Sequence, residues 1–287
     1  MKALILGAGG QLGRALVETA PAGTELVALD RQGCDIGDPD QVKAAIAAAM
    51  PAILFNAAAY TGVDRAESEP ELAQRLNADA AGTIAAAAGE AGARMVHVST
   101  DFVFGGAAAT PRAPGDPCDP QGVYARTKHA GERAVAAACP DALIVRTAWL
   151  YAARGANFVN TMLRLMAERD EVRVVADQVG TPTWAPSLAR ALWALAGAGA
   201  RGVHHYTDAG VASWYDFAVA VEEESRAAGL RDRPVRVVPI ATADYPAPAP
   251  RPSYSVLDKS ATWALLGGTA PHWRVNLREN MRELLDL

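Results

Sequence analysis

A tyrosine and a lysine, Tyr124 and Lys128, stand four positions apart near the middle of this 287-residue chain. On a helix this spacing places both side chains on one face. A phenol, whose ordinary pKa is about 10, can protonate the oxygen of a carbonyl group during reduction, and a nearby ammonium stabilises the phenolate that remains. The pair therefore indicates carbonyl reduction. Because Tyr-x-x-x-Lys also arises by chance, its place in the fold must support this interpretation.

A second polar group, Ser99-Thr100-Asp101, ends the strand-like run that begins at Arg94. At the end of a strand, the Thr100 hydroxyl can donate a hydrogen bond to the oxyanion that develops as hydride reaches the carbonyl carbon. Thr100, Tyr124 and Lys128 are thus the candidate catalytic residues, and Lys128 can also hold a nicotinamide ribose. The competing interpretation is a strand-end threonine, an interfacial tyrosine and a solvated lysine.

The hydride donor is indicated by the N-terminal loop Gly7-Ala8-Gly9-Gly10-Gln11-Leu12-Gly13. Gly7, Gly10 and Gly13 lie between an apolar run and a helix-like segment. There glycine permits a tight turn, a close approach to a pyrophosphate and close packing of helix on strand. The N–H groups of the helix start can bind the phosphates. The loop predicts a dinucleotide site, and a glycine-rich turn without a ligand is the alternative.

The residues after the next strands bear on which dinucleotide is bound. Asp30 can accept hydrogen bonds from the adenosine ribose and so favours NADH, whereas Arg31 could pair with the 2′-phosphate of NADPH. We therefore expect a site of dual specificity for NADH and NADPH. Asp35 and Ile36 could flank the adenine, and the small residues at 57–59 let a cofactor lie against the backbone.

The elements that must position these residues alternate between strand-like and helix-like through the first half of the chain. Continuous apolar strands between helices are typical of a parallel sheet covered on both faces. We predict an α/β fold with a Rossmann-type, doubly wound parallel sheet over residues 1–150. The expected strands are 2–7, 25–30, 52–58, 94–100 and 142–149. The expected helices are 11–20, 39–50, 68–92 and 124–138.

The alternation loosens after residue 150. Residues 151–287 are expected to form mainly a smaller substrate-binding lobe, with some segments returning to the Rossmann sheet and the ligand in the cleft between lobes. The proline-rich stretch 245–252 reads as irregular. The expected helices are 157–169, 187–196 and 213–228, and the expected strands 172–175, 203–207 and 235–240.

Composition excludes several classes of protein. A net charge of −5 without a basic stripe argues against nucleic-acid binding and leaves a small-molecule substrate. The most apolar internal stretch, 44–59, is interrupted by Pro51 and Asn56, so no membrane span is expected. Three cysteines without a C-x-x-C pair predict neither a disulfide framework nor a zinc site, and we expect a cytoplasmic protein. The adjacent His204 and His205 are interpreted as structural.

With these motifs in place, the chain resembles the extended short-chain dehydrogenase/reductases, and among them the dTDP-4-dehydrorhamnose reductases. The resemblance extends over most of the chain in family order. The stretches that carry it are 10–13 (GQLG), 56–67 (NAAAYTGVDRAE), 98–104 (VSTDFVF), 124–132 (YARTKHAGE), 146–151 (RTAWLY), 157–158 (NF), 178–183 (QVGTPT) and 251–252 (RP).

The resemblance implies reduction of the 4-keto group of dTDP-4-dehydro-β-L-rhamnose by NADPH or NADH to dTDP-β-L-rhamnose. It makes Tyr124 the proton donor, Lys128 its partner and Thr100 a donor to the carbonyl oxygen. Thr100 and Asp101 would contact the sugar, and Trp149 would form a wall of its pocket. The residues implied for the cofactor site are Gly10, Gln11, Leu12, Asp30, Asp35, Ile36, Ala59, Tyr60, Thr61 and Lys128.

Two further substrate contacts follow from the residues themselves. Asn157 stands at a helix start, where a diphosphate is favoured. Arg251, set between prolines, could pair with a diphosphate, with a surface arginine as the alternative.

The chain departs from the family where some members join a homodimer through magnesium-bound glutamates. Ala15 and Pro186 occupy the corresponding positions, so magnesium is doubtful while a homodimer stays open. Tyr60 replaces a common histidine, which we expect to be tolerated. Two other functions stay open: another sugar-nucleotide reductase or epimerase of the superfamily, and a non-catalytic regulatory subunit like that of methionine adenosyltransferase.

Overall fold

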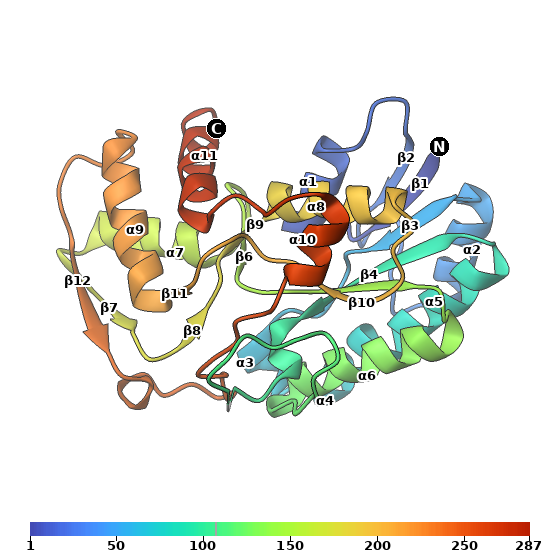
Figure 1. The fold of residues 1–287 in the computed structure, drawn as a ribbon, viewed down its shortest axis with the longest axis horizontal. Helices are drawn as coiled ribbons and strands as arrows, with labels where there is room; N and C mark the ends of the chain where they lie inside the picture. Colours follow the sequence, from blue (N-terminus) through green and yellow to red (C-terminus); the bar gives the residue numbers. More distant parts are fainter. Residues whose placement is uncertain (107) are drawn as a thin grey trace.

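The fold is organised around a parallel sheet of six strands in the order β10-β5-β4-β3-β1-β2, in a computed structural model that describes residues 1–106 and 108–287 (Figure 1). The arrangement confirms the predicted doubly wound α/β fold. In chain order the strands are β1 (Lys2–Leu6), β2 (Glu25–Leu29), β3 (Ile53–Asn56), β4 (Arg94–Thr100), β5 (Leu143–Thr147) and β10 (Gly202–His205).

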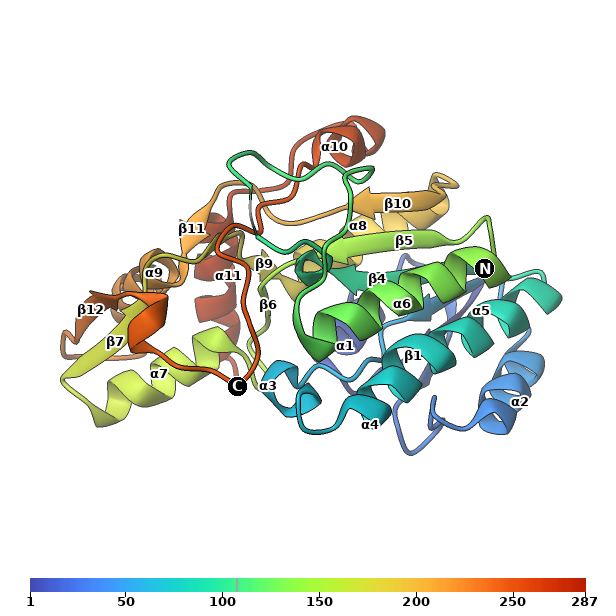
Figure 2. The same ribbon diagram turned by 90° about the horizontal axis from the view of Figure 1, so that it is seen from below.

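Helices cover both faces of this sheet (Figure 2). On one face lie α2 (Pro39–Ala49), α5 (Ala80–Glu90) and α6 (Gly122–Ala138), and on the other α1 (Gln11–Glu18) and α8 (Ala185–Gly197). Alternate residues of one strand enter opposite cores: Leu4 packs towards α2 and α5, and Ile5 towards α1 and α8. Burial on both faces explains why the strands are continuously apolar.

The strand order reverses at β1, which lies between β2 and β3. In open parallel sheets ligands bind beyond the carboxyl ends of the strands at such a switch point. Loop 7–10 follows β1 at this edge, and the 3₁₀ turn η2 (Asp101–Val103) follows β4. The fold therefore gathers the cofactor loop and the candidate catalytic threonine at one edge.

The helical region expected over 68–92 is present from Pro70 to Glu90, but a π-helical turn interrupts its α-helical course. The structure has α4 (Pro70–Gln74), a π-helical turn η1 (Arg75–Asp79) and then α5, and a short helix α3 (Val63–Ala66) precedes them. The wide turn packs against α6, where a Cβ on Gly131 would lie 2.1 Å from the Asn77 carbonyl oxygen. The contact with α6 favours a π turn here. The hydrophobic pattern of the segment itself carries no information about this contact.

A second group of elements has a core of its own, around residues such as Tyr151 and Phe217. The helices are α7 (Phe158–Glu168), α9 (Trp214–Ala227) and α11 (Trp273–Leu285), grouped at the left of Figure 1. The paired strands are β6 (Leu150–Tyr151) with β9 (Thr183–Trp184), β7 (Glu171–Val175) with β12 (Arg236–Ile240), and β8 (Val179–Gly180) with β11 (Ala212–Ser213).

Some C-terminal segments belong to the Rossmann sheet: β10 pairs with β5, and α8 packs against α1. Helix α10 (Ser260–Leu266) lies on α8. Residues 245–252 are irregular, as expected, and follow the 3₁₀ turn η3 (Thr242–Asp244). Among the described residues, no helix has the length and apolar character needed to cross a membrane.

Candidate active site

The glycine loop between β1 and α1 is packed so closely that two of its glycines leave no room for a side chain. Gly7 has φ +83°, and a Cβ there would lie 2.7 Å from the Ala58 nitrogen. A Cβ on Gly13 would lie 2.1 Å from the Gly7 carbonyl oxygen. Gly10, the N-cap of helix α1, has no side chain to cap the helix, which leaves the N–H groups of its first turn, from Gln11 onward, for an anion. The loop therefore fits a pyrophosphate.

Replacing Gly13 by alanine should weaken cofactor binding strongly. The methyl group would displace the Gly7 carbonyl, and overpacking of this size costs about 1–3 kcal/mol, so we expect the NADPH Kd to rise about tenfold or more. Fluorescence titration would measure it. Gly197→Ala, where a Cβ meets nothing within 4 Å, is the control. An unchanged Kd for Gly13→Ala would contradict the assigned role of this loop.

The acidic residues expected to contact the adenosine lie after β2. Their carboxylates accept hydrogen bonds from backbone N–H groups of the turns that follow them. Asp30 accepts the N–H groups of Gln32 and Gly33 through Oδ1, at 2.9 and 3.0 Å. Arg31 is exposed beside it. Asp35 accepts the Gly37 N–H at 2.9 Å, and Ile36 packs partly against the core. The Asp30 carboxylate and the Arg31 guanidinium thus stand side by side. The first favours NADH and the second favours NADPH, which is the basis for predicting that both cofactors are used.

The segment after β3 holds the other implied cofactor residues, Ala59, Tyr60 and Thr61. The Tyr60 N–H donates to Asn77 Oδ1 at 2.8 Å, and its phenol donates to Glu69 at 2.5 Å. Asn77 also donates to the Tyr60 carbonyl and to Thr127 Oγ1, both at 3.1 Å. Sequence reasoning missed Asn77, which fixes the backbone of this segment to helix α6.

Thr100 and Tyr124 lie together at the carboxyl edge of the sheet. The Thr100 hydroxyl donates to Asp101 Oδ1 at 3.0 Å, and the Tyr124 ring packs edge-on against Phe102 with centroids 5.6 Å apart. Burial raises the pKa of Tyr124 to about 12, although a hydrogen bond with Thr100 opposes this rise. Burial also raises the pKa of Asp101 to about 6, against the hydrogen bonds of Ser255 and Thr100. At neutral pH Tyr124 is thus a phenol with a proton to donate.

Lys128 lies one helical turn further along α6, with 3% of its surface exposed. Its Nζ donates to the Val98 carbonyl at 2.7 Å. Burial lowers the pKa of Lys128 to about 8, while the charge of Glu132 opposes this shift. The ammonium is therefore held by the β4 backbone. The groups that act on the pKa of Tyr124, besides its burial, are Thr100 and Asp101.

The pKa of Lys128 predicts how activity depends on pH. The lysine carries its charge below a pH of about 8 and loses it as the pH rises through that value. If the ammonium is required, reduction should slow about tenfold per pH unit above 8. Initial rates between pH 6.5 and 9.5 under saturating cofactor would show this. A flat profile up to pH 9.5 would contradict a role for the charged form.

A cavity of about 520 Å³ lies beside these residues, between Phe102 and the second core. Trp149, at φ +46°, forms part of its wall and stacks on Trp214 with ring centroids 3.5 Å apart. A Cβ on Gly180 would lie 2.6 Å from the Trp149 ring, which fixes the indole in place. The predicted position of Trp149 in the wall of a ligand pocket is consistent with this geometry.

The two diphosphate candidates have protein partners of their own. Asn157 caps α7 by accepting the Asn160 N–H at 3.0 Å, and its amide donates to Gln11 Oε1 at 2.8 Å. It thus connects the cofactor loop to a helix that lines the cavity. Arg251 also lines the cavity, but its guanidinium makes two bonds of 2.8 Å to Asp64. A diphosphate role for either residue stays a prediction.

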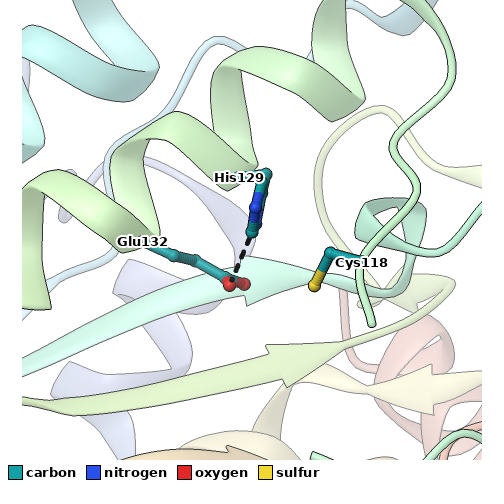
Figure 3. Close-up of side chains that lie close together, drawn as sticks. All are labelled: Cys118, His129 and Glu132. Atoms are coloured by element: carbon teal, nitrogen blue, oxygen red, sulfur yellow. Dashed lines mark ion pairs between the residues drawn. The ribbon is translucent and has the colours of Figure 1, made fainter. Parts of the chain in front are cut away.

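Behind α6, the side chains of Cys118, His129 and Glu132 approach one another closely enough to suggest a metal site (Figure 3). The Arg146 guanidinium already binds both Glu132 oxygens, at 2.9 and 2.7 Å, and donates to Cys118 Sγ at 3.3 Å. This cation supplies the positive charge that the cluster needs. We interpret the cluster as a buried ion pair that fixes α6 to β5, and the motif residues Glu132 and Arg146 thereby acquire a role.

Comparison with known proteins agrees with this geometry. The RmlD substrate binding domain family matches residues 1–285. The dTDP-4-dehydrorhamnose reductase of Burkholderia thailandensis is 43% identical, over 99% of each chain. That of Mycobacterium tuberculosis is 47% identical over 94% of this chain and 89% of its own. A Bacillus anthracis dTDP-4-dehydrorhamnose reductase in complex with NADP is 35% identical, covers 98% of this chain and 99% of its own, and has a TM-score of 0.93.

Proposed function

Because this chain belongs to the RmlD substrate binding domain family, we propose that it reduces the 4-keto group of dTDP-4-dehydro-β-L-rhamnose with NADPH or NADH. The product is dTDP-β-L-rhamnose, and the reaction is the last step of its synthesis. The observation that carries the proposal is the grouping of Thr100 and Tyr124 around Phe102, which lines the 520 Å³ cavity, with Lys128 one helical turn away.

NADPH or NADH, when bound, supplies the hydride. The residues that would hold the cofactor are the glycine loop, Asp30 and Arg31 for the adenosine, and Lys128 for the nicotinamide ribose. The tight glycine packing and the uncapped start of α1 support this placement, because both favour an approaching pyrophosphate.

The chain's own residues then act on the sugar carbonyl. Thr100 turns its hydroxyl proton from Asp101 Oδ1 to the carbonyl oxygen as negative charge develops there. Tyr124, a phenol with a pKa of about 12, transfers its proton to that oxygen and becomes a phenolate. The positive charge of Lys128 favours the phenolate until solvent returns the proton. Phe102 and Trp149 would exclude water from one side of the sugar, because they line the cavity with aromatic surface.

The wider setting is proposed on the same basis. The partner is a dTDP-sugar bound between a Rossmann domain over 1–150 and a mainly substrate-binding lobe over 151–287. Ala15 and Pro186 offer no side-chain oxygen, so a homodimer would form without the magnesium bridge of some relatives. The cytoplasm is the proposed location, because Cys34, Cys118 and Cys139 are all unpaired.

The direct test mixes purified protein with dTDP-4-dehydrorhamnose and either NADPH or NADH and follows the absorbance of the reduced nicotinamide. We expect turnover with both cofactors, and omission of magnesium should leave the rate unchanged. Absence of turnover with either cofactor would refute the proposed reductase.

A further inference from the structure

The motif Val63-Asp64-Arg65-Ala66-Glu67 follows the cofactor segment, and the reaction just described gives it no role. Its first four residues form α3, and Glu67 is the C-cap of this helix. The two acidic residues of the motif stand three positions apart. Each binds a different distant segment: Glu67 binds the start of α6, and Asp64 binds the irregular loop at 249–251. The first segment carries Tyr124, and the second lines the cavity.

Glu67 supplies the cap that α6 lacks locally. Gln121, at the N-cap position, makes no capping bond with its side chain. Instead, Glu67 Oε1 accepts the Val123 N–H at 2.7 Å, although it lies 56 residues earlier in the chain. Gly122, at φ +80°, allows the approach, since a Cβ there would be 2.8 Å from the same oxygen. A carboxylate at a helix start also interacts favourably with the helix dipole. The residue after Val123 is Tyr124.

Asp64 fixes the cavity loop in a similar way. Its two oxygens accept from Arg251 Nη1 and Nη2, each at 2.8 Å, and Oδ1 also accepts the Ala249 N–H at 3.2 Å. Pro250, between these two residues, packs against the start of α6, where its Cδ would be 3.1 Å from a Cβ on Gly122. Planar two-bond pairing of this kind fixes orientation as well as distance.

We propose that Asp64 and Glu67 are positioning residues of the reductase: Glu67 sets the place of Tyr124, and Asp64 sets the place of the cavity wall at 249–251. The inference rests on the proposed reduction and extends it. In this proposal Arg251 is the structural partner of Asp64. Helix α3 then connects the segment that carries the proton donor Tyr124 with the cavity wall at 249–251.

The two acids should affect different kinetic constants. Loss of the cap lets the first turn of α6 fray, so Glu67→Ala should lower kcat about tenfold while KM changes little. Glu67→Gln keeps a carbonyl oxygen at the same place and should restore most of kcat. Asp64→Asn loosens the loop and should raise the KM for the dTDP-sugar about fivefold with kcat nearly unchanged. Glu71→Ala is the matched control, since it removes an exposed acid from the neighbouring helix α4.

One exchange measurement and one binding measurement make the test independent of turnover. Hydrogen exchange at the Val123 and Tyr124 amides should accelerate at least about tenfold in Glu67→Ala and much less in Glu67→Gln. The Kd of dTDP, measured by calorimetry, should rise in Asp64→Asn. Melting temperatures of all variants separate these local changes from general unfolding.

Several results would overturn the inference. Equal loss of kcat in Glu67→Ala and Glu67→Gln would show that the charge acts, not the cap. A lower KM or dTDP Kd in Asp64→Asn would show that Asp64 competes with the diphosphate for Arg251. Unchanged exchange at Val123 would remove the positioning role of Glu67. If the wild-type enzyme were inactive, the proposed reduction would be refuted and not this inference. The hydrogen-exchange and dTDP-binding measurements would still test the positioning roles of Glu67 and Asp64.

Discussion

Replacing Tyr124 by phenylalanine should lower kcat by about 10²–10⁴-fold, the usual contribution of a positioned general acid. The variant keeps the ring that packs on Phe102 and loses the hydroxyl that bonds with Thr100. Reduction would then have to draw its proton from water. We expect the NADPH Kd and the melting temperature to stay close to wild type. Single-turnover absorbance measurements would separate the chemical step from product release.

The control for this variant makes the same chemical change elsewhere. Tyr215 is half-buried on α9, outside the residues that line the cavity, and Tyr215→Phe should keep kcat within about twofold of wild type. If Tyr124→Phe retained full activity, the proton would have to come from another group. The mechanism would then fail, although the fold and the cofactor loop would stand.

The largest expected effect on stability comes from the buried pair Glu132–Arg146. Both side chains are about 5% exposed. Burial by itself raises the pKa of Glu132, but the Arg146 hydrogen bond outweighs it and holds the pKa at about 2. Glu132→Gln would leave the Arg146 charge buried without its counterion, and the free energy of unfolding should fall by about 3–5 kcal/mol. Urea unfolding at pH 7 would measure this loss.

An exposed pair provides the comparison. Glu279→Gln breaks the surface contact with Arg282 and should cost no more than about 1 kcal/mol. The double variant Glu132→Met with Arg146→Met should cost less than the sum of the single changes, because no unpaired charge remains. The stabilisation by Glu132 should be present above pH 4.5, the ordinary pKa, and disappear as the pH falls towards about 2. A loss below about 1 kcal/mol for Glu132→Gln would contradict the importance of this pair.

The part of the site that could be predicted from sequence is the part whose requirements are local. Gly7 and Gly13 allow close backbone contacts within a short loop, and Tyr124 and Lys128 share one face of a single helix. The continuously apolar strands likewise predict that both faces of the sheet are buried, because each strand residue faces one core or the other. Periodicity and turn chemistry contain this information directly.

What could not be predicted depends on contacts between distant segments. Asp64 meets Arg251 across 187 positions, and Asn157 meets Gln11 across 146. The π-helical turn at Asn77 fits the surface of α6, and nothing in its own window of sequence distinguishes it from a regular helix. Arg251 illustrates the consequence: an isolated arginine between prolines suggests a free cation for a diphosphate, whereas the fold gives it a carboxylate partner.

The most direct measurement of the central claim follows a deuterium atom. Wild-type protein is incubated with dTDP-4-dehydrorhamnose and NADPH that carries deuterium at both hydrogen positions of nicotinamide C4, and the sugar product is examined by NMR and mass spectrometry. A reductase that works as described delivers the label to C4 of the sugar, with one oxidised cofactor per dTDP-rhamnose formed. Product without deuterium at C4, or a rearranged sugar with no net oxidation of NADPH, would contradict it and indicate an epimerase or another activity of the superfamily.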